Sequence, residues 1–352
     1  MIKLMFPWMP PAWQLAPYLE RIGETHQYTN NGPLVQELER RLSNEVFDGV
    51  PCCVVSNGTS ALELALRAKG ATSSGESVLV PAMSFRASGL AIESAGAMAL
   101  LTDVEPTNWT LTAMRALDVL AKHKDFRYVM PVCAFGVALP VATWCDLADN
   151  FGIEVIIDAA GAMCAQHPVN HHRVLQCFSL HATKIIGAGE GGVVVGPASM
   201  VEDVRRLASF GPGGTNAKMS EYHAAVALAS LDNLHAKLRE WARVSDLYAE
   251  HLPANITRQT APTTGSTILP VLLPEHYLAS AAQLVLASRG IETKQWYRPF
   301  LNEPGALKWP YPYETMVVTN TIRDRMLGLP FHHALTTEDV IAVCTALKEI
   351  CL

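Results

Sequence analysis

Two charged side chains in this sequence occupy positions that are unusual for charged groups. Lys184 lies in the segment SLHATK, among small and apolar neighbours and separated by two residues from GAGEGG. Burial there would lower the pKa of its amine and favour the neutral, nucleophilic form, which condenses with carbonyl groups. Asp158 ends the apolar segment IEVIID. Because an unpaired carboxylate is costly to desolvate, a cationic partner gives a physical reason for its position.

Two further segments offer groups that would hold a flat, phosphorylated molecule. Residues 57–60, with the sequence NGTS, form a turn that opens a predicted helix. The free N–H groups and the positive dipole end at such a turn favour a phosphate, and Gly58, Thr59 and Ser60 are its candidate ligands. Phe85 follows a predicted strand and offers a flat ring contact.

Pyridoxal phosphate needs all four of these groups. Its aldehyde needs an amine, its ring nitrogen needs a carboxylate that keeps it protonated, its phosphate needs an anchor, and its ring needs a flat contact. The sequence therefore predicts a pyridoxal-phosphate site in which Lys184 and Asp158 carry the chemistry.

Each of these groups also has an ordinary structural explanation. Thr59 or Ser60 can be a helix N-cap, and a carboxylate at Asp158 can cap a helix or stabilise a turn. An aromatic residue such as Phe85 after a strand is often part of the core, and a lysine beside a glycine loop is often solvated. The prediction therefore depends on the four groups occurring together.

Three glycines suggest a different cofactor. Gly187, Gly189 and Gly192 match the pattern GxGxxG, which would indicate a nicotinamide-linked oxidoreductase. That motif follows a strand, opens a helix and has an acidic residue about 20 positions later, whereas GVVVG here continues as a strand. We expect the glycines to let the backbone bend closely around a cofactor beside Lys184.

These residues must be positioned by alternating strands and helices, which indicate an α/β fold with a mostly parallel sheet covered by helices on both faces. Because Asp158 ends a predicted strand, it lies where open α/β sheets usually bind ligands. The predicted strands are 52–56, 77–81, 97–104, 127–132, 153–158, 176–184 and 192–196. The predicted helices are 60–70, 88–95, 111–123 and 142–152.

A second, smaller α+β lobe is predicted after this pattern. A long helical stretch over residues 220–251 would lead the chain out of the first lobe, and a strand over 267–273 and helices over 279–288 and after Thr336 would follow. Proline-rich residues 299–312 would form loops near a pocket mouth. We expect a large cofactor-binding domain over residues 1–235, including an N-terminal arm, and a small domain over 236–352.

Composition limits the classes of partner. A net charge of −6 and a pI of 6.1 offer no basic field for nucleic acid, and no apolar run approaches a membrane span. The eight cysteines occur without a CxxC motif, which is typical of a reducing cytoplasm. The pairs at 171–172 and 332–333 are histidines, but adjacent side chains diverge on a strand or helix, so we expect no metal site. Small molecules are the expected ligands.

Taken in order, the segments resemble the DegT/StrS-type nucleotide-sugar aminotransferases, a branch of the fold type I pyridoxal-phosphate enzymes. The resemblance extends over nearly the whole chain, and SLHATK followed by GEGG is its most specific part. It is carried by YTNNGPLVQELE, SNGTSALELALRA, VPAMSFRAS, VIIDAAGAM, FSLHATKIIGAGEGGVVV, KMSEYHAAVALASLDNL, GIETKQWYRPF and LGLPFHHALTTEDV.

The resemblance implies roles for individual residues. Lys184 would hold the cofactor as a Schiff base and later move the proton between cofactor and substrate, while Asp158 would pair with the pyridine nitrogen. Ser179 would add a hydroxyl to the phosphate ligands Gly58, Thr59 and Ser60, and Phe85 would stack on the ring. Asn216 would reach the phosphate of a neighbouring subunit, which implies a homodimer with its active site at the interface.

Three positions depart from the family pattern. Gly161 stands where Gln or His contacts the cofactor's ring hydroxyl, Lys218 where an arginine is frequent, and Asn302 where a histidine is frequent in the substrate loop. Lys218 together with Tyr297 and Arg298 of the proline-rich loop are candidate substrate contacts.

The resemblance implies transfer of an amino group, from glutamate as donor, to C4 of a nucleotide-linked deoxysugar such as dTDP-4-keto-6-deoxyglucose, in a pathway to surface polysaccharide such as lipopolysaccharide O-antigen or to a glycosylated metabolite. Two alternatives are an aminotransferase for a cyclitol or other non-nucleotide ketone, and a non-catalytic regulatory protein of the same fold.

Overall fold

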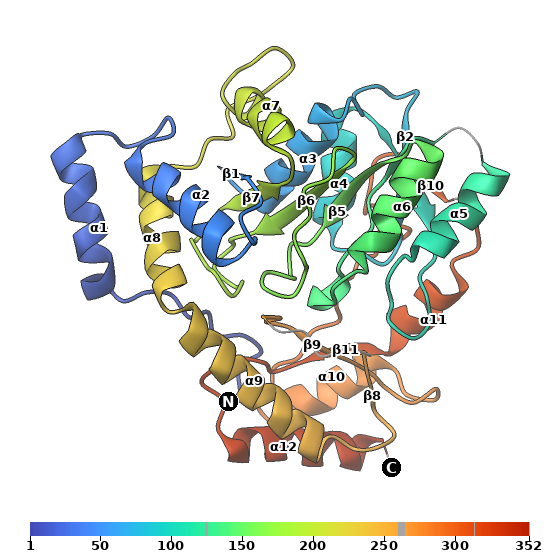
Figure 1. The fold of residues 1–352 in the computed structure, drawn as a ribbon. Helices are drawn as coiled ribbons and strands as arrows, with labels where there is room; N and C mark the ends of the chain where they lie inside the picture. The colour runs from blue at the N-terminus through green and yellow to red at the C-terminus, as the bar shows by residue number, and fades with distance from the viewer. Residues whose placement is uncertain (124–125, 260–264, 313, 352) are drawn as a thin grey trace.

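The computed structural model describes residues 1–123, 126–259, 265–312 and 314–351. Within these residues the main sheet has eight strands in the order β1-β7-β6-β5-β4-β2-β3-β10 (Figure 1). Neighbouring strands are parallel except that β7 is antiparallel to both β1 and β6. The strands are β1 (Cys52–Val55), β2 (Ser77–Pro81), β3 (Met98–Thr102), β4 (Tyr128–Val129), β5 (Glu154–Asp158), β6 (Val174–Ser179), β7 (Gly192–Val195) and β10 (Pro310–Pro312).

Helices cover both faces of this sheet, which is why β1, β2, β3, β5, β6 and β7 are buried at nearly every position rather than at alternate ones. One apolar cluster joins one face to α3 (Gly58–Ala68), α4 (Arg86–Ala95) and α7 (Ala198–Ala208). A second cluster joins the other face to α2 (Pro33–Glu45), α5 (Ala113–Lys122), α6 (Val141–Phe151) and α8 (Glu221–Asp232). The predicted α/β sheet with helices on both faces is confirmed.

A smaller α+β lobe follows and packs below the main sheet in the view of Figure 1. Its antiparallel sheet has the order β11-β9-β8 in the described residues. Its elements are α9 (Leu234–His251), β8 (Thr257–Arg258), β9 (Leu269–Leu272), α10 (Ala279–Ser288), α11 (Val317–Arg325), β11 (Met326–Leu329) and α12 (Thr337–Ile350). Thr336 and Asp339 form a capping box that fixes the start of α12.

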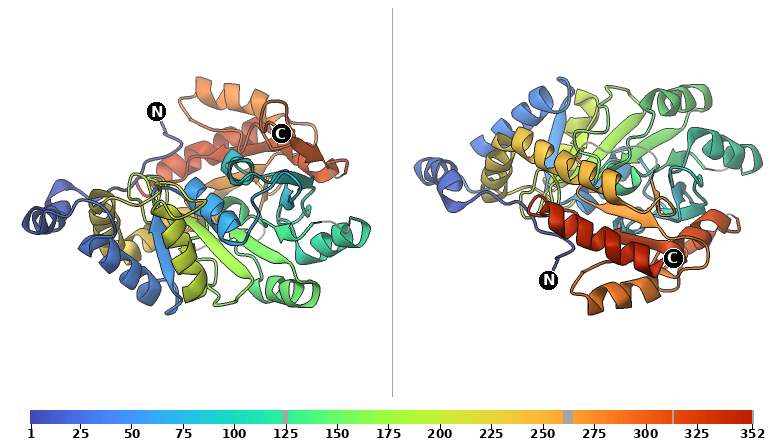
Figure 2. Two further views of the ribbon diagram at one scale, coloured as in Figure 1. Left: turned by 90° about the horizontal axis from the view of Figure 1, so that it is seen from above. Right: turned by 90° about the horizontal axis from the view of Figure 1, so that it is seen from below.

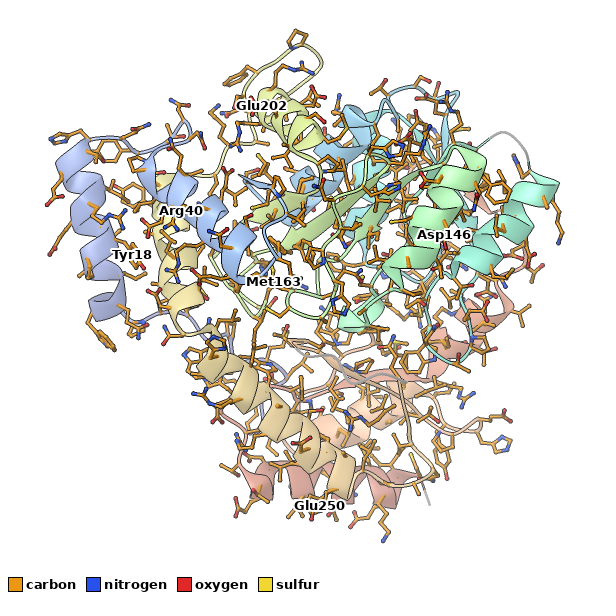
Figure 3. The ribbon with its side chains drawn as sticks, viewed as in Figure 1. Tyr18, Arg40, Asp146, Met163, Glu202 and Glu250 are labelled. Atoms are coloured by element: carbon orange, nitrogen blue, oxygen red, sulfur yellow. The ribbon has the colours of Figure 1, made fainter. Side chains whose placement is uncertain are left out.

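The N-terminal arm makes two different contacts. Its helix α1 (Ala12–Thr25) packs against α8, and the Tyr18 hydroxyl, labelled in Figure 3, donates to Asp232 at 2.8 Å. In both views of Figure 2, α1 projects at one end of the molecule. The residues before α1 run along the second lobe instead, where Ile2 pairs with Ile291 and Leu4 accepts from the backbone N–H of Phe331.

Several local predictions differ from the structure. The stretch 220–251 is two helices that meet at Asn233, and the strand predicted to run to Lys184 ends at Ser179. The proline-rich residues are not loop throughout, since β10 joins the edge of the main sheet beside β3. The helix predicted over 279–288 is confirmed. Because β10 and the arm both cross between the lobes, the division after residue 235 stays a prediction.

No helix within the described residues is long and apolar enough to cross a membrane.

Candidate active site

Strand direction brings the predicted site residues to one edge of the main sheet. β7 reverses the chain direction relative to both of its neighbours, so β1 runs the same way as β6, β5, β4 and β2. The turn at residues 56–60, Phe85, Asp158 and Ser179 therefore follow or end strands on the same edge. Lys184 lies on the loop after β6, only five positions beyond Ser179.

The start of α3 forms a cradle suited to a phosphate. Asn57 caps the helix by accepting from the backbone N–H of Ser60 at 2.8 Å. The amides of Gly58 and Thr59 have no acceptor among the described residues, so two donors face outward at the positive end of the helix. Figure 1 shows α3 beside β1 and β7. The cradle at the start of α3 lies just after the end of β1.

Two small residues let Ser179 join this cradle. A Cβ on Gly58 would lie 3.0 Å from the Cβ of Ser179, and one on Gly192 would lie 2.2 Å from the carbonyl oxygen of Asn57. Any side chain at Gly192 would therefore push the turn away from the sheet. The Ser179 hydroxyl accepts from the N–H of His181 at 3.2 Å, so its own proton is free to be donated to a phosphate.

Replacing Ser179 by alanine is expected to weaken cofactor binding without disturbing the fold. A hydrogen bond to a charged group contributes about 1.5–3 kcal/mol, so affinity for pyridoxal phosphate should fall roughly tenfold to hundredfold. Titration of the cofactor-free protein measures this, with Ser288→Ala in the second lobe as the control because Ser288 donates only to its own helix. Equal affinity in Ser179→Ala and the wild type would remove Ser179 from the cradle.

Asp158 is a buried carboxylate held by donors on one side. It is 5 % exposed and accepts from the Ser88 hydroxyl at 2.6 Å and from the backbone N–H of Ala160 at 3.1 Å. Burial raises its pKa, while the two hydrogen bonds and the charge of Lys184 oppose the rise. A cation placed against this carboxylate would favour its charged form, which is the property needed to keep a pyridine nitrogen protonated.

Lys184 has the complementary properties. Its amine makes no hydrogen bond or ion pair to any described residue, and burial lowers its pKa, with the charge of Asp158 opposing the change. The two groups are therefore close enough to act on each other, and each is shifted toward its neutral form. A lowered pKa favours the neutral amine, which is the form that attacks an aldehyde.

The shift in Lys184 predicts a measurable reactivity in the cofactor-free protein. Its neutral amine should form below the ordinary pKa of 10.5, so labelling by an acylating reagent should reach half its maximum at lower pH than for a free lysine. Asp158→Asn should move this midpoint lower still, because it removes the negative charge that stabilises the ammonium. Peptide mass spectrometry across a pH series measures both, and a midpoint raised by Asp158→Asn would contradict the assignment.

Phe85 presents an aromatic face beside the same strand ends. It is 55 % exposed although it is large and apolar, and it immediately precedes α4. The Tyr297 ring meets Phe85 edge to face with centroids 5.9 Å apart, and it stacks on Phe135 at 4.5 Å. An exposed aromatic ring supported from behind is suited to stacking on a flat ligand.

Comparison with known proteins matches this geometry to one family. Residues 14–348 match the model of the DegT/DnrJ/EryC1/StrS aminotransferase family. The chain belongs to this family.

Individual relatives and solved structures agree with that assignment. A dTDP-4-amino-4,6-dideoxy-D-glucose transaminase from Shigella dysenteriae is 28% identical over 366 residues, covering 98% of this chain and 97% of the relative. An L-glutamine:scyllo-inosose aminotransferase from Streptomyces griseus is 30% identical over 303 residues, covering 76% and 71%. The crystal structure of DesI in the presence of its TDP-sugar product superposes with a TM-score of 0.87 at 26% identity, covering 99% and 92%.

The arrangement is that of a fold type I aminotransferase, and pyridoxal phosphate is the expected cofactor of the family. The residues present suit it, since a phosphate cradle, an exposed aromatic face, a buried carboxylate and a lysine whose pKa is lowered by burial lie at one edge of the sheet. Gly161 leaves no side chain for a ring hydroxyl, and its carbonyl oxygen packs against Gly136, where a Cβ would lie 2.6 Å away. The usual ring contact is therefore absent from this position.

Asn216, Lys218 and Arg298 make contacts with their own neighbours. Asn216 is exposed and accepts from the Lys218 amine at 2.6 Å, and that amine also lies 4.3 Å from the ring centroid of Phe210. Arg298 pairs with Glu303 at 2.7 Å and lies 3.7 Å from Asp324, so acidic neighbours already balance its charge. Their roles stay predictions.

Two serines were missed by sequence reasoning. Ser84 and Ser88 flank Phe85, and their hydroxyls lie 2.6 Å apart, with Ser88 in turn bonded to Asp158. Both are fully buried. Their spacing of four residues beside Phe85 was the available signal, because such a spacing places two side chains on one side of a helical turn.

The wall beside Lys184 was missed as well. The N-terminal strap, residues 5–8, closes over a small cavity that reaches Lys184, and two side chains of this wall, Trp241 and His332, have the buried nitrogens Nε1 and Nδ1 without a partner among the described residues. Both unpartnered nitrogens therefore belong to side chains that line the wall beside Lys184. The full lining is Met5, Phe6, Pro7, Trp8, Thr183, Lys184, Trp241, Thr267, Phe331 and His332.

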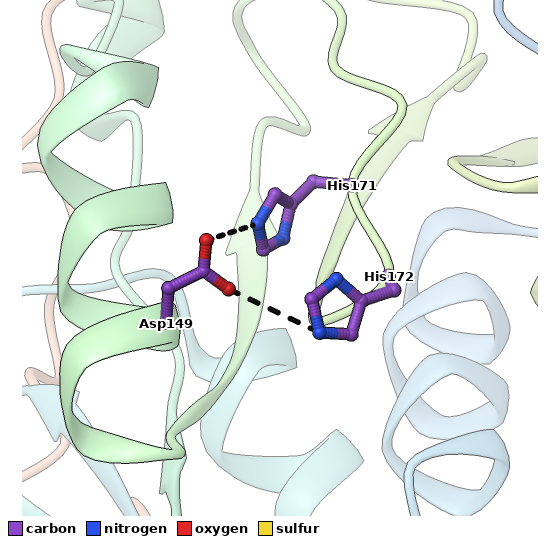
Figure 4. Close-up of side chains that lie close together, drawn as sticks. All are labelled: Asp149, His171 and His172. Atoms are coloured by element: carbon purple, nitrogen blue, oxygen red, sulfur yellow. Dashed lines mark hydrogen bonds and ion pairs between the residues drawn. The ribbon is translucent and has the colours of Figure 1, made fainter.

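One histidine pair does not diverge as expected. Figure 4 shows both rings facing Asp149, with Nε2 of His171 at 3.2 Å and Nε2 of His172 at 3.9 Å from its oxygens. The expectation was wrong because the pair lies in a turn before β6, where the alternation of a strand does not apply. Nδ1 of His171 accepts from the Arg173 N–H, so the neutral ring carries its proton on Nε2 and donates it to Asp149. The ligand atoms of Asp149, His171 and His172 lie within 4.8 Å of one another, which a metal ion would require, so the absence of a metal stays a prediction.

Proposed function

We propose that this chain transfers an amino group from an amino acid, with glutamate as donor, to C4 of a nucleotide-linked keto-deoxysugar such as dTDP-4-keto-6-deoxyglucose. The observation that carries the proposal is that Asp158 at the end of β5 and Lys184 on the loop after β6 each feel the charge of the other, while burial shifts each toward its neutral form. The relatives that act on dTDP-linked sugars support the substrate class, because they match over nearly the whole of both chains.

Each functional side chain has a separate role in the proposed reaction. The cofactor supplies an aldehyde for covalent linkage and a ring that stores the electrons of a broken C–H bond. Lys184 gives the amine for that linkage and, once displaced from it, holds a proton for the substrate carbon. Asp158 keeps the ring nitrogen protonated, Ser88 holds Asp158 in place, and the cradle with Ser179 orients the phosphate.

A second substrate class is supported by a specific relative. The aminotransferase for scyllo-inosose, a cyclitol ketone, has the highest identity of the three relatives described, although over a shorter part of both chains. Both substrates are polyhydroxylated rings with one keto group, so the same reacting group, Lys184, would serve either of them. A non-catalytic regulatory role is less well supported, since the nucleophile and the carboxylate are both present.

The visible spectrum tests the cofactor and the donor together. A lysine-bound pyridoxal phosphate absorbs near ~410–430 nm and the aminated cofactor near ~330 nm. We expect glutamate to convert the first band to the second, and dTDP-4-keto-6-deoxyglucose to restore the first. Restoration by scyllo-inosose alone would transfer the assignment to the cyclitol class, and no band after reconstitution would refute the proposed function.

The active form is proposed to be a cytoplasmic homodimer whose sites lie at the subunit interface. Support comes from large apolar side chains left exposed around the arm and the loop before α8, namely Trp13, Leu19, Tyr28, Phe210 and Tyr222. Asn216 lies in that loop, exposed and able to reach beyond its own subunit. Mixing Lys184→Ala and Asn216→Ala protomers should restore activity if Asn216 serves the partner's site, whereas monomers in solution would refute it.

A further inference from the structure

A second lysine is buried beneath the loop that carries Lys184. Lys237, on α9, is 1 % exposed and forms no ion pair with a described carboxylate. Its amine donates to the Ser230 hydroxyl at 2.6 Å and to the carbonyl oxygen of Ile185 at 3.2 Å. Ile185 directly follows Lys184, so this bond holds the second peptide group after the nucleophile.

Ser230 also contacts the loop, two residues beyond Ile185. Its hydroxyl oxygen accepts from the backbone N–H of Gly187 at 3.1 Å. A Cβ on Gly187 would lie 2.9 Å from the carbonyl oxygen of Ala182 and 3.0 Å from the sulfur of Met9, so the loop is also tightly enclosed. Lys237 and Ser230 thus satisfy one acceptor and one donor of the backbone immediately after Lys184.

We propose that Lys237 and Ser230 form a positioning pair that fixes the direction in which Lys184 leaves the backbone, and so sets the rate of amino transfer. The inference rests on the proposed function of Lys184. The pair joins α8 and α9 to the active-site loop, so it also links that loop to the helix that leads into the second lobe.

Stability alone does not explain a lysine at this place. Burial lowers the pKa of Lys237 to about 8, which reflects the cost of removing an ammonium from water. An apolar side chain of similar length would fill the space at lower cost, because buried charges are often replaced by apolar groups without loss of stability. The specific gain from lysine is a donor that reaches the backbone of the Lys184 loop.

The test compares Lys237→Met, Ser230→Ala and the double variant. A misplacement of about 1 Å can cost on the order of 100-fold in rate, so we expect each single variant to lower kcat at least about tenfold. In the cofactor-free protein the Gly187 amide should exchange with solvent at least about tenfold faster in each variant. Ser230→Ala removes the acceptor of this amide, and Lys237→Met removes the amine that holds the Ser230 hydroxyl in place. The affinity for pyridoxal phosphate should change less than about threefold, because the Gly58 and Thr59 amides of the phosphate cradle lie on a different loop.

The double variant and a control separate positioning from general damage. Since both residues act on one loop, the double variant should lose no more activity than the worse single variant. Lys69→Met is the matched control: Lys69 is another buried lysine, paired with Glu154 at 2.9 Å and away from the Lys184 loop. It should lower the free energy of unfolding and leave kcat and Gly187 exchange unchanged.

The outcomes distinguish this inference from the function on which it rests. If Lys184→Ala retains turnover, the proposed function fails. If Lys184→Ala is inactive while the positioning variants keep wild-type kcat and Gly187 exchange, only the positioning pair is refuted. If Lys237→Met does not fold, Ser230→Ala decides alone, since a folded Ser230→Ala protein with unchanged kcat and exchange would overturn the proposal.

Discussion

Replacing Lys184 by alanine is expected to abolish amino transfer while leaving a folded protein. The residue is half-buried and its amine has no hydrogen-bond partner among the described residues, so its loss should leave the fold unchanged. Its loss removes both the nucleophile for the cofactor and the group that moves the proton, and proton transfer by a positioned side chain alone is worth roughly 10²–10⁴-fold. Turnover should therefore fall by at least about 10³-fold, as measured by amino-sugar formation under saturating glutamate.

Two controls accompany this prediction. Lys348→Ala, at an exposed position on α12, should keep full activity. Added methylamine should restore part of the lost rate in Lys184→Ala, because a small amine can enter the vacated space and accept the proton. Retained turnover in Lys184→Ala would contradict the assignment of the nucleophile.

Asp158→Asn should give the second-largest loss. Asparagine keeps the shape but carries no charge, and its single oxygen replaces only one of the two carboxylate oxygens, which accept separately from Ser88 and from the Ala160 amide. Breaking a buried ion pair by removing one partner costs about 3–5 kcal/mol, so kcat should fall on the order of 10²- to 10³-fold. The cofactor-bound protein should also lose the protonated state of the ring nitrogen at neutral pH, which its absorption spectrum reports.

The size of this loss separates two roles for Asp158. If the carboxylate only stabilises the fold, Asp158→Asn should lower the free energy of unfolding and leave kcat within about twofold, since burial already disfavours its charge. If it holds the ring nitrogen protonated, kcat should fall while unfolding changes little. Equal kcat in the wild type and Asp158→Asn would refute the second role.

Structural features that depend on a few neighbouring residues could be predicted from the sequence. Asp158 at the end of an apolar strand, the capped turn before α3 and the lysine beside glycines each have local signatures, because hydrophobic periodicity and turn chemistry depend on near neighbours. Their order along the chain was enough to indicate the family. The helix 279–288 was predicted for the same reason, since its pattern ends at Gly290.

Contacts that join distant parts of the chain were decided by the tertiary structure. Ser88 reaches Asp158 only because β2 and β5 are two places apart in the sheet, and Lys237 reaches Ile185 only because α9 packs under that loop. Sequence patterns report which residues are apolar and how often they recur, whereas these pairs depend on sheet order and on which loops close over it. The sequence by itself therefore determined the reacting groups, and the fold decided which neighbours hold them in place.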